Sequence, residues 1–299
     1  MNVHQIITDR ILQSLEQGVI PWRRPWKVAG RPRNFISTKP YRGINVLLLA
    51  VQGYSSPYWI TYKQATERGG FVRKGEKSTP IVFWKVTEGT KARQDGEGTE
   101  TDRRFTLRYY NVFNIEQTTL APADATPAEP FPSCSAVVDG WQNKPRLVLD
   151  SPTIDRAAYI PAQDTVIMPL LSRFDSQEHF FATLYHEFIH STGHASRLNR
   201  EAITTGARFG SESYSREELI AEIGSAFLCG HTGINKPEIE ENTTAYLQNW
   251  IAVLKGDSRL VVSAAAHAQH AADMILGTAE KEQTHDAGEL TTTTESQAA

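Results

Sequence analysis

The pattern of apolar and polar positions predicts a mixed first part of the chain. Apolar residues recur at helical spacing over residues 3–17, and a second apolar segment over 44–51 is also expected to be helical. Segments rich in β-branched and aromatic residues, typical of strands, occur at 59–62, 81–86 and 105–113. A polar, glycine-containing stretch over 88–103 predicts a hairpin loop. We therefore expect a small α+β domain over residues 1–125.

Helical periodicity dominates the second part of the chain. A shift in composition toward Ala, Pro, Thr and acidic residues marks a linker at 126–132, followed by a second, mainly helical domain over 133–277. Residues 278–299 have the polar composition of a disordered tail. The expected class is α+β with two domains. Short strands are expected at 146–149 and 165–169, and helices at about 175–190, 215–229, 242–255 and 258–276.

Charge divides the chain in the same way. Residues 1–120 hold 19 Lys and Arg against 10 Asp and Glu, a net charge of +9, whereas the remainder has 12 against 24, a net of −12. The two parts are therefore expected to do different jobs. Two cysteines are too few for a disulfide framework, which predicts a reducing, cytoplasmic setting. No signal peptide or membrane span is expected, because the chain lacks both patterns.

A metal-binding pattern lies in the helix expected at about 175–190. His186 and His190 are four residues apart, so on a helix both imidazoles face the same side and can bind one ion. Glu187 follows the first histidine and can act as a general base on a metal-activated water. This arrangement predicts a zinc-dependent peptidase-type site, with Mn²⁺ or another divalent metal as the alternative. The competing interpretation is a helix with two surface histidines.

The third metal ligand is expected from a later helix. One class of zinc peptidases uses a histidine six residues after the second one, but here that position is Ser196. The other class uses a glutamate, which Glu218 supplies, with Glu222 as the alternative ligand or as a partner of a ligand histidine. Ser215 and Glu218 also match a capping box, which needs no metal. Glu217 is expected to be solvated.

The basic part of the chain combines cations with aromatic rings. Cations neutralise phosphates, and flat rings stack on unpaired bases, so this mixture favours single-stranded nucleic acid. The alternative is that Trp59 and Trp84, inside expected strands, belong to the core. The candidate contact residues are Trp22, Arg23, Arg24, Trp26, Lys27, Trp59, Lys63, Lys74, Lys77 and Trp84.

Ordered motifs in both parts resemble one known family. In the first part they are Ile20-Pro21-Trp22-Arg23-Arg24-Pro25-Trp26, Tyr41-Arg42-Gly43-Ile44-Asn45, Trp59-Ile60-Thr61-Tyr62-Lys63-Gln64 and Tyr109-Tyr110-Asn111-Val112-Phe113-Asn114. These resemble the N-terminal domain of ArdC-type plasmid antirestriction proteins, a domain that some plasmid primases share. In the second part, His186 to His194 and Glu218 to Glu222 resemble the zincin-like peptidase domain of that family.

The resemblance implies a function that spacing alone does not. It implies that the first domain binds single-stranded DNA, with Tyr41 and Asn45 among the contacts, and that the protein protects incoming plasmid DNA from host restriction during conjugation. It also implies a zinc metallopeptidase-type site of unknown substrate. Our hypothesis is that this site cleaves a host protein, with a restriction component as the candidate target. The alternative is a DNA-binding protein with a structural metal and no proteolysis.

Overall fold

A computed structural model describes residues 2–23, 31–92, 99–120, 132–149, 156–206, 208, 211–234 and 243–278. The chain forms two compact units, one of Met1–Glu129 with Glu238–Ser263, the other of Pro130–Pro237 with Ala264–Ala299. The α+β class and a sheet domain followed by a mainly helical one are confirmed. Most of the expected linker and all but residue 278 of the expected disordered tail lie outside the described residues.

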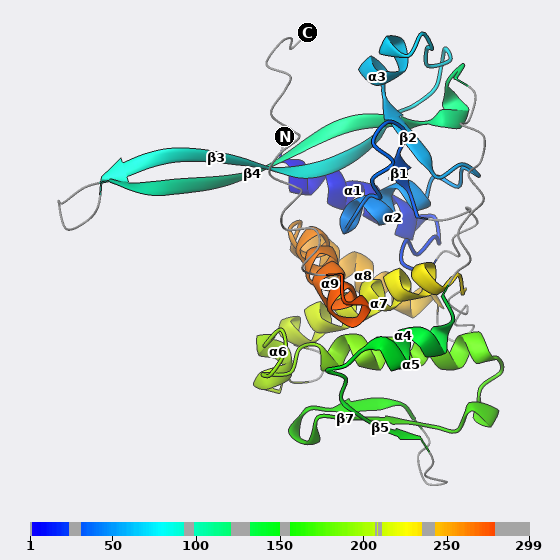
Figure 1. The fold of residues 1–299 in the computed structure, drawn as a ribbon, viewed down its shortest axis with the longest axis vertical. Helices are drawn as coiled ribbons and strands as arrows, with labels where there is room; N and C mark the ends of the chain where they lie inside the picture. The colour runs from blue at the N-terminus through cyan, green and yellow to red at the C-terminus, as the bar shows by residue number, and fades with distance from the viewer. Residues whose placement is uncertain are drawn as a thin grey trace. The chain divides into compact units, whose positions relative to one another are not determined.

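The first unit is built on a four-stranded sheet. Its strand order is β1-β2-β4-β3, with β2 and β3 both antiparallel to β4 and β1 parallel to β2 (Figure 1). Buried Leu49, Trp59 and Val112 form one core cluster, which joins the second helix to the sheet. The strands are β1 (Arg33–Asn34), β2 (Tyr58–Thr61), β3 (Thr79–Ala92) and β4 (Thr99–Asn114), and the helices are α1 (Val3–Glu16), α2 (Ile44–Ala50), α3 (Tyr62–Glu67) and the 3-10 turn η1 (Ile115–Gln117).

The hairpin of β3 and β4 is longer than the sequence predicts. Residues 88–92 and 99–103, expected in a loop, pair as strands that continue the ladder as far as Ala92 and Thr99. The loop was predicted because residues 88–103 are polar, but the strand ladder is made by backbone hydrogen bonds, which polar residues such as Thr, Glu and Lys also form. In Figure 1 the hairpin extends well beyond α1 and α2 of its own unit.

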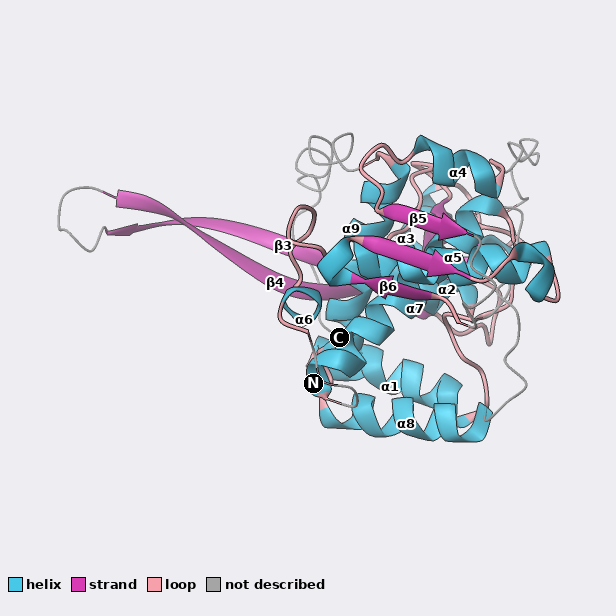
Figure 2. Cartoon of the chain, turned by 90° about the horizontal axis from the view of Figure 1, so that it is seen from below, coloured by secondary structure: helices cyan, strands magenta, loops and turns pink. Residues whose placement is uncertain are grey.

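Helix α8 (Thr243–Gly256) belongs to the first unit, although the sequence assigns it to the second domain. It lies along α1, as Figure 2 shows. The Trp22 ring packs edge-on against Trp250 with 5.9 Å between centroids, and Trp22 Nε1 donates to the Tyr246 hydroxyl at 3.1 Å. These aromatic contacts join residues more than 200 positions apart, which no local pattern reports.

The second unit places a three-stranded sheet against a helix. The strand order is β5-β7-β6, with β5 parallel and β6 antiparallel to the central β7, so β6 is an edge strand (Figure 2). Both β6 and β7 contact α5. The strands are β5 (Arg146–Leu149), β6 (Ala158–Ile160) and β7 (Thr165–Met168), and the helices are α4 (Cys134–Gly140), η2 (Pro161–Gln163), η3 (Leu171–Arg173), α5 (Gln177–Ser191), α6 (Glu201–Thr204), α7 (Glu212–Thr232) and α9 (Leu260–Leu276), whose first residues fall in the first unit.

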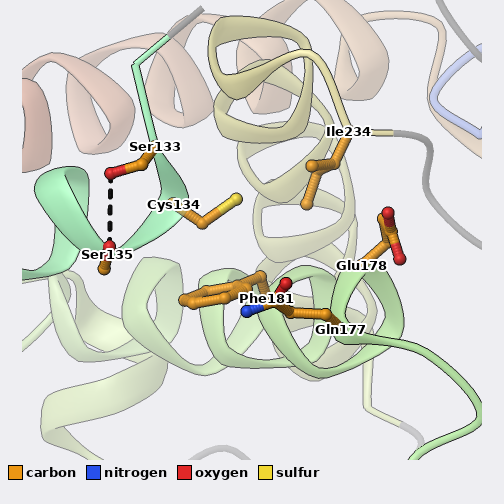
Figure 3. A pocket seen from close by; sticks show the side chains of 7 residues that line it. All are labelled: Ser133, Cys134, Ser135, Gln177, Glu178, Phe181 and Ile234. Atoms are coloured by element: carbon orange, nitrogen blue, oxygen red, sulfur yellow. Dashed lines mark hydrogen bonds between the residues drawn. The ribbon is translucent and has the colours of Figure 1, made fainter.

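Helix α5 begins two residues later than the helix expected at about 175–190 and packs an apolar face into the core. Ser176 caps it by accepting from the amide of His179. Leu184, Phe188 and Ile189 are buried. Phe181 is half-buried and lines a small pocket with Cys134 and Ile234, drawn in Figure 3. Among the described helices, none has the length and apolarity needed to cross a membrane.

Helices α5 and α7 approach each other closely at Gly224. A Cβ placed there would lie 2.7 Å from Ile189 Cδ1 and 2.9 Å from its Cγ1. Gly224→Ala is therefore expected to reduce the free energy of unfolding by about 1–3 kcal/mol through overpacking, although alanine is the better helix former. Thermal or urea unfolding measures the change. Gly256→Ala, with open space around its Cβ, is the control, and equal stability of both variants would contradict the prediction.

Candidate metal centre

Helix α5 brings His186 and His190 to one face, as their spacing predicts. Their rings are nearly perpendicular with centroids 4.7 Å apart, and the two Nε2 atoms lie 3.1 Å from each other. His190 is buried, with only 9% of its surface exposed. With their Nε2 atoms this close, both imidazoles can bind one metal ion. This arrangement argues against the alternative of two unrelated surface histidines.

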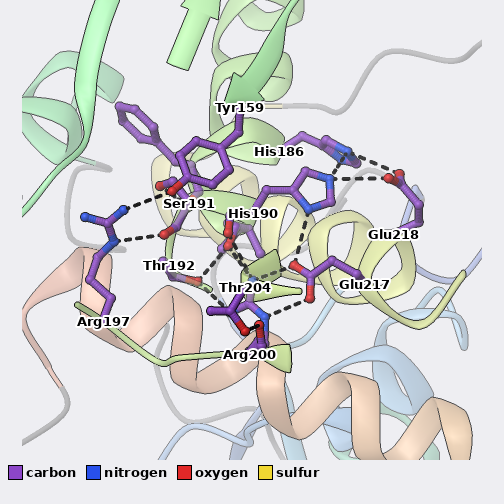
Figure 4. Close-up of polar contacts among 12 residues, drawn as sticks. Tyr159, His186, His190, Ser191, Thr192, Arg197, Arg200, Thr204, Glu217 and Glu218 are labelled. Atoms are coloured by element: carbon purple, nitrogen blue, oxygen red, sulfur yellow. Dashed lines mark hydrogen bonds and ion pairs between the residues drawn. The ribbon is translucent and has the colours of Figure 1, made fainter. Parts of the chain in front are cut away.

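Helix α7 adds the carboxylate of Glu218. Its Oε2 lies 3.5 Å from His186 Nε2, and its Oε1 lies 3.5 Å from His190 Nε2 (Figure 4). One ligand atom from each of these three residues falls within 4.8 Å of the others, a group that does not include Glu222. The helix begins with Ser211 as its cap, so Ser215 lies inside it. The capping-box explanation for Glu218 is therefore wrong.

Glu217 is the functional residue that the sequence prediction missed. It was expected in solvent, yet only 4% of its surface is exposed. Its Oε1 lies 3.2 Å from His190 Nδ1, and Arg200 donates to both carboxylate oxygens, at 2.9 Å from Nε and 2.6 Å from Nη2 (Figure 4). Arg200 also donates to Thr192 Oγ1 at 2.7 Å and to the carbonyl of Ile189 at 2.8 Å. Glu217 is thus the hydrogen-bond partner of His190, one of the two candidate ligand histidines.

The electrostatics of this cluster favour a cation. Burial by itself lowers the pKa of His190, but the hydrogen bond with Glu217 and the charges of Glu218 and Glu187 raise it above the ordinary value. Burial by itself raises the pKa of Glu217, but Arg200 and His190 hold it below the usual range. An ionised Glu217 only accepts hydrogen bonds, so His190 Nδ1 donates to it. In its neutral form, His190 then has its Nε2 lone pair directed at His186 and Glu218.

The general-base candidate Glu187 is anchored to the edge strand. Its Oε2 accepts the backbone amide of Tyr159, in β6, at 2.8 Å. Tyr214, in the first turn of α7, hydrogen-bonds to Glu218, and burial together with the charges of Glu218 and Glu187 raises its pKa to about 12. Tyr214 therefore stays protonated at neutral pH, and its phenol can donate a hydrogen bond.

A second polar network supports the neighbourhood of Glu187. The Tyr159 hydroxyl donates to Asp164 Oδ1 at 2.9 Å, and Arg197 forms an ion pair with the same carboxylate. Arg197 Nε also donates to the carbonyl of Ser191, at the end of α5, at 2.8 Å. Arg197 thus links strand β6 and the β6–β7 connection to the end of α5. Its role is therefore structural.

The donor set fits a divalent metal. Two imidazoles and one carboxylate are three protein ligands, the number typical of catalytic zinc sites, which leave a further position for water or substrate. A charged Glu217 behind His190 is the kind of outer partner that fixes a ligand histidine. The carboxylates of Glu187, Glu217 and Glu218 lie around the imidazoles of His186 and His190, so the cluster attracts positive charge.

The DNA-binding candidates of the first unit fall into different environments. Trp22 and Trp59 are 1% and 2% exposed, which corrects their prediction as base contacts, since buried rings offer no free face. Arg23 lies over the Tyr246 ring at 4.1 Å. Asn45 holds the backbone of Val82 with both amide atoms, and Tyr41 packs against the sheet core, so both have structural roles. Lys63, Lys74, Lys77 and Trp84 are exposed, while Arg24, Trp26 and Lys27 lie outside the described residues.

Comparison with known proteins identifies both units. Residues 1–113 match the family described as the N-terminal domain of anti-restriction factor ArdC, and residues 147–267 match the zincin-like metallopeptidase family. Two Escherichia coli proteins named DNA primase TraC are 34% and 32% identical over 93% of this chain, which spans 27% and 20% of their length. The uncharacterized protein y4eC of Sinorhizobium fredii is 31% identical, with 92% of this chain and 91% of that protein covered.

Solved structures of an ArdC protein are similar to this chain over nearly its whole length. The metal-free crystal structure of the antirestriction ArdC protein from the R388 plasmid superposes with a TM-score of 0.74 at 36% identity, covering 94% of this chain and 99% of that one. The Mn(II)-bound structure of the same protein gives a TM-score of 0.72 at 37% identity, covering 95% and 100%. A manganese-bound relative and a zincin-like domain support a divalent-metal site here. The chain belongs to the ArdC antirestriction protein family.

Proposed function

We propose that this protein is an antirestriction factor that binds single-stranded DNA and protects incoming plasmid DNA from host restriction during conjugation. Membership of the ArdC family and the antirestriction role in the name of its solved relative support this proposal. The net charge of +9 over residues 1–120 suits a domain that holds a polyanion. The primase activity named for the TraC proteins is not transferred, because this chain spans about a quarter or less of their length.

We further propose that the second unit is a zinc-dependent peptide hydrolase. The observation that carries this is the convergence of His186, His190 and Glu218 within 4.8 Å. These three residues would hold the ion, which when bound polarises a scissile carbonyl and makes a water molecule easier to deprotonate. A restriction component of the recipient cell is the protein target that this proposal predicts.

The roles of the chain's own residues follow from their contacts. Glu187 takes the proton of the attacking water, and its anchoring amide at Tyr159 fixes the orientation of the carboxylate. Glu217 holds His190 through Nδ1, so that Nε2 remains a ligand atom. Tyr214, kept protonated, donates a hydrogen bond to the oxygen on which negative charge develops.

Glu187→Gln tests whether hydrolysis contributes to protection. The amide oxygen of glutamine still accepts the Tyr159 amide, and all three proposed ligands remain, but the base is gone. Hydrolysis of denatured casein by the zinc-loaded protein is expected to fall about 100-fold or more. Protection is measured as plasmid transfer into a restricting recipient relative to a non-restricting one.

The control for this substitution is Glu178→Gln, which changes an exposed carboxylate in the first turn of the same helix. If Glu187→Gln abolishes both hydrolysis and protection, proteolysis is part of the mechanism. If protection persists without hydrolysis, DNA coating alone explains the function and the metal is structural. Hydrolysis by Glu187→Gln at the wild-type rate would contradict the role of this carboxylate.

A further inference from the structure

The β3–β4 hairpin presents two faces of different chemistry. Side chains alternate between the faces of a strand, and the pairs Phe83–Arg108 and Lys85–Thr106 place these residues on the same face. We define the hairpin face as the exposed surface formed by Phe83, Lys85, Arg104, Arg108 and Tyr110, which the register places on this side. Between the pairs Ile81–Tyr110 and Thr87–Arg104 it contains no acidic side chain.

An aromatic stack lies at the centre of the hairpin face. The rings of Phe83 and Tyr110 are nearly parallel, at 6°, with centroids 4.4 Å apart. Phe83 is half-buried, whereas Tyr110 keeps 50% of its surface exposed. The pair therefore has an open aromatic surface on which a third flat ring can continue the stack. Exposed rings on a sheet are the platform on which unpaired bases stack.

Cations flank this stack on the same side. Arg108 pairs across the ladder with Phe83, and the exposed Lys85 lies two residues farther along β3. Arg104 follows on β4, so the face extends about 20 Å from Tyr110 at the usual rise per residue. In the same stretch the opposite face carries Trp84, Phe105 and Tyr109 but no cation. Only the hairpin face combines rings for bases with charges for phosphates.

We infer that the hairpin face is the surface on which this protein binds single-stranded DNA, with a base stacked on Tyr110 and phosphates paired with Lys85, Arg104 and Arg108. This inference rests on the proposed function and gives it a location. The base contact expected at Trp22 and Trp59, which are buried, is assigned instead to the exposed Tyr110. The inference also assigns Trp84, which is exposed, to the other face, where its ring lies 6.4 Å from that of His4.

Tyr110→Ala and Tyr109→Ala form a matched pair, because the two tyrosines are adjacent, similarly exposed at 50% and 43%, and on opposite faces. Binding of a fluorescent single-stranded oligonucleotide to the full-length protein is measured by anisotropy. Loss of one stacked base corresponds to roughly a 5- to 100-fold weaker Kd for Tyr110→Ala, with Tyr109→Ala within about twofold of wild type. Unfolding curves verify that both variants fold.

The salt dependence of the same measurement tests the cations. Removal of one phosphate contact by Lys85→Ala or Arg108→Ala is expected to reduce the slope of log K against log salt by about 0.7. Arg146→Ala, an exposed arginine of the second unit, should leave the slope unchanged. A duplex of equal length is the competitor, and a preference for duplex would overturn base stacking.

The outcomes separate the inference from the proposed function. If the wild-type protein does not bind single-stranded DNA, the proposed function fails and the inference with it. If the wild-type protein binds but Tyr110→Ala and Tyr109→Ala have equal affinity, the hairpin face is overturned and single-strand binding stands. If Tyr109→Ala is the weaker binder, the opposite face is the interface.

Discussion

Glu217→Ala is expected to lower the free energy of unfolding of the second unit by about 3–5 kcal/mol. The substitution leaves the Arg200 guanidinium buried, 8% exposed, without the carboxylate that accepts two of its hydrogen bonds. It also removes the acceptor of His190 Nδ1–H. Metal affinity is expected to fall by about 10- to 100-fold, the usual effect of losing the partner of a ligand histidine.

Two further variants separate the structural effect from the effect on the metal. Glu212→Ala, at an exposed position in the first turn of the same helix, should change neither quantity. In Arg200→Met with Glu217→Leu the charged pair is gone as a whole, so stability is expected to recover while metal affinity stays low. Chemical unfolding and titration with Zn²⁺ provide the two readouts. Wild-type metal affinity in the double variant would contradict the role of Glu217.

The burial of Glu217 could not be predicted from local sequence, in contrast to the shared face of His186 and His190. The His186–His190 pair was predicted because both residues lie on one helix, where spacing fixes their direction. The environment of Glu217 depends on Arg200, a residue on a separate segment 17 positions earlier, and no local pattern reports that contact. A solvated carboxylate and a buried one read the same in the sequence, so only the packing of α5 against α7 distinguishes them.

The same distinction explains the aromatic residues of the first unit. The helix over 3–17 was predicted because its core face repeats at helical spacing, and the one over 44–51 because the segment is almost wholly apolar. Trp22 lies in a turn after α1, and its partners Tyr246 and Trp250 come from the other end of the chain. Composition alone suggested an exposed ring for stacking, whereas the fold uses it to attach α8. The exposed rings of the hairpin become recognisable only once the strand register is known.

The metal ligands themselves are tested by substitution of the two glutamates that the sequence left open. With saturating Zn²⁺ or Mn²⁺, the wild-type second unit is expected to gain about 2.7 kcal/mol of stability when the free metal reaches 100 times its Kd. Glu218→Gln is expected to lose this gain, because the amide replaces the carboxylate that lies 3.5 Å from both imidazoles. Glu222→Gln is expected to keep it.

Thermal unfolding with and without metal, each after treatment with EDTA, measures the difference within every variant. Comparison within one variant removes any change that the substitution itself makes to the unloaded protein. Glu218 is a suitable position, because its side chain is 28% exposed and a neutral isostere there leaves no buried cation behind. A metal-dependent shift that survives in Glu218→Gln and disappears in Glu222→Gln would move the third ligand one helical turn along α7. It would also mean that metal binding rearranges this helix.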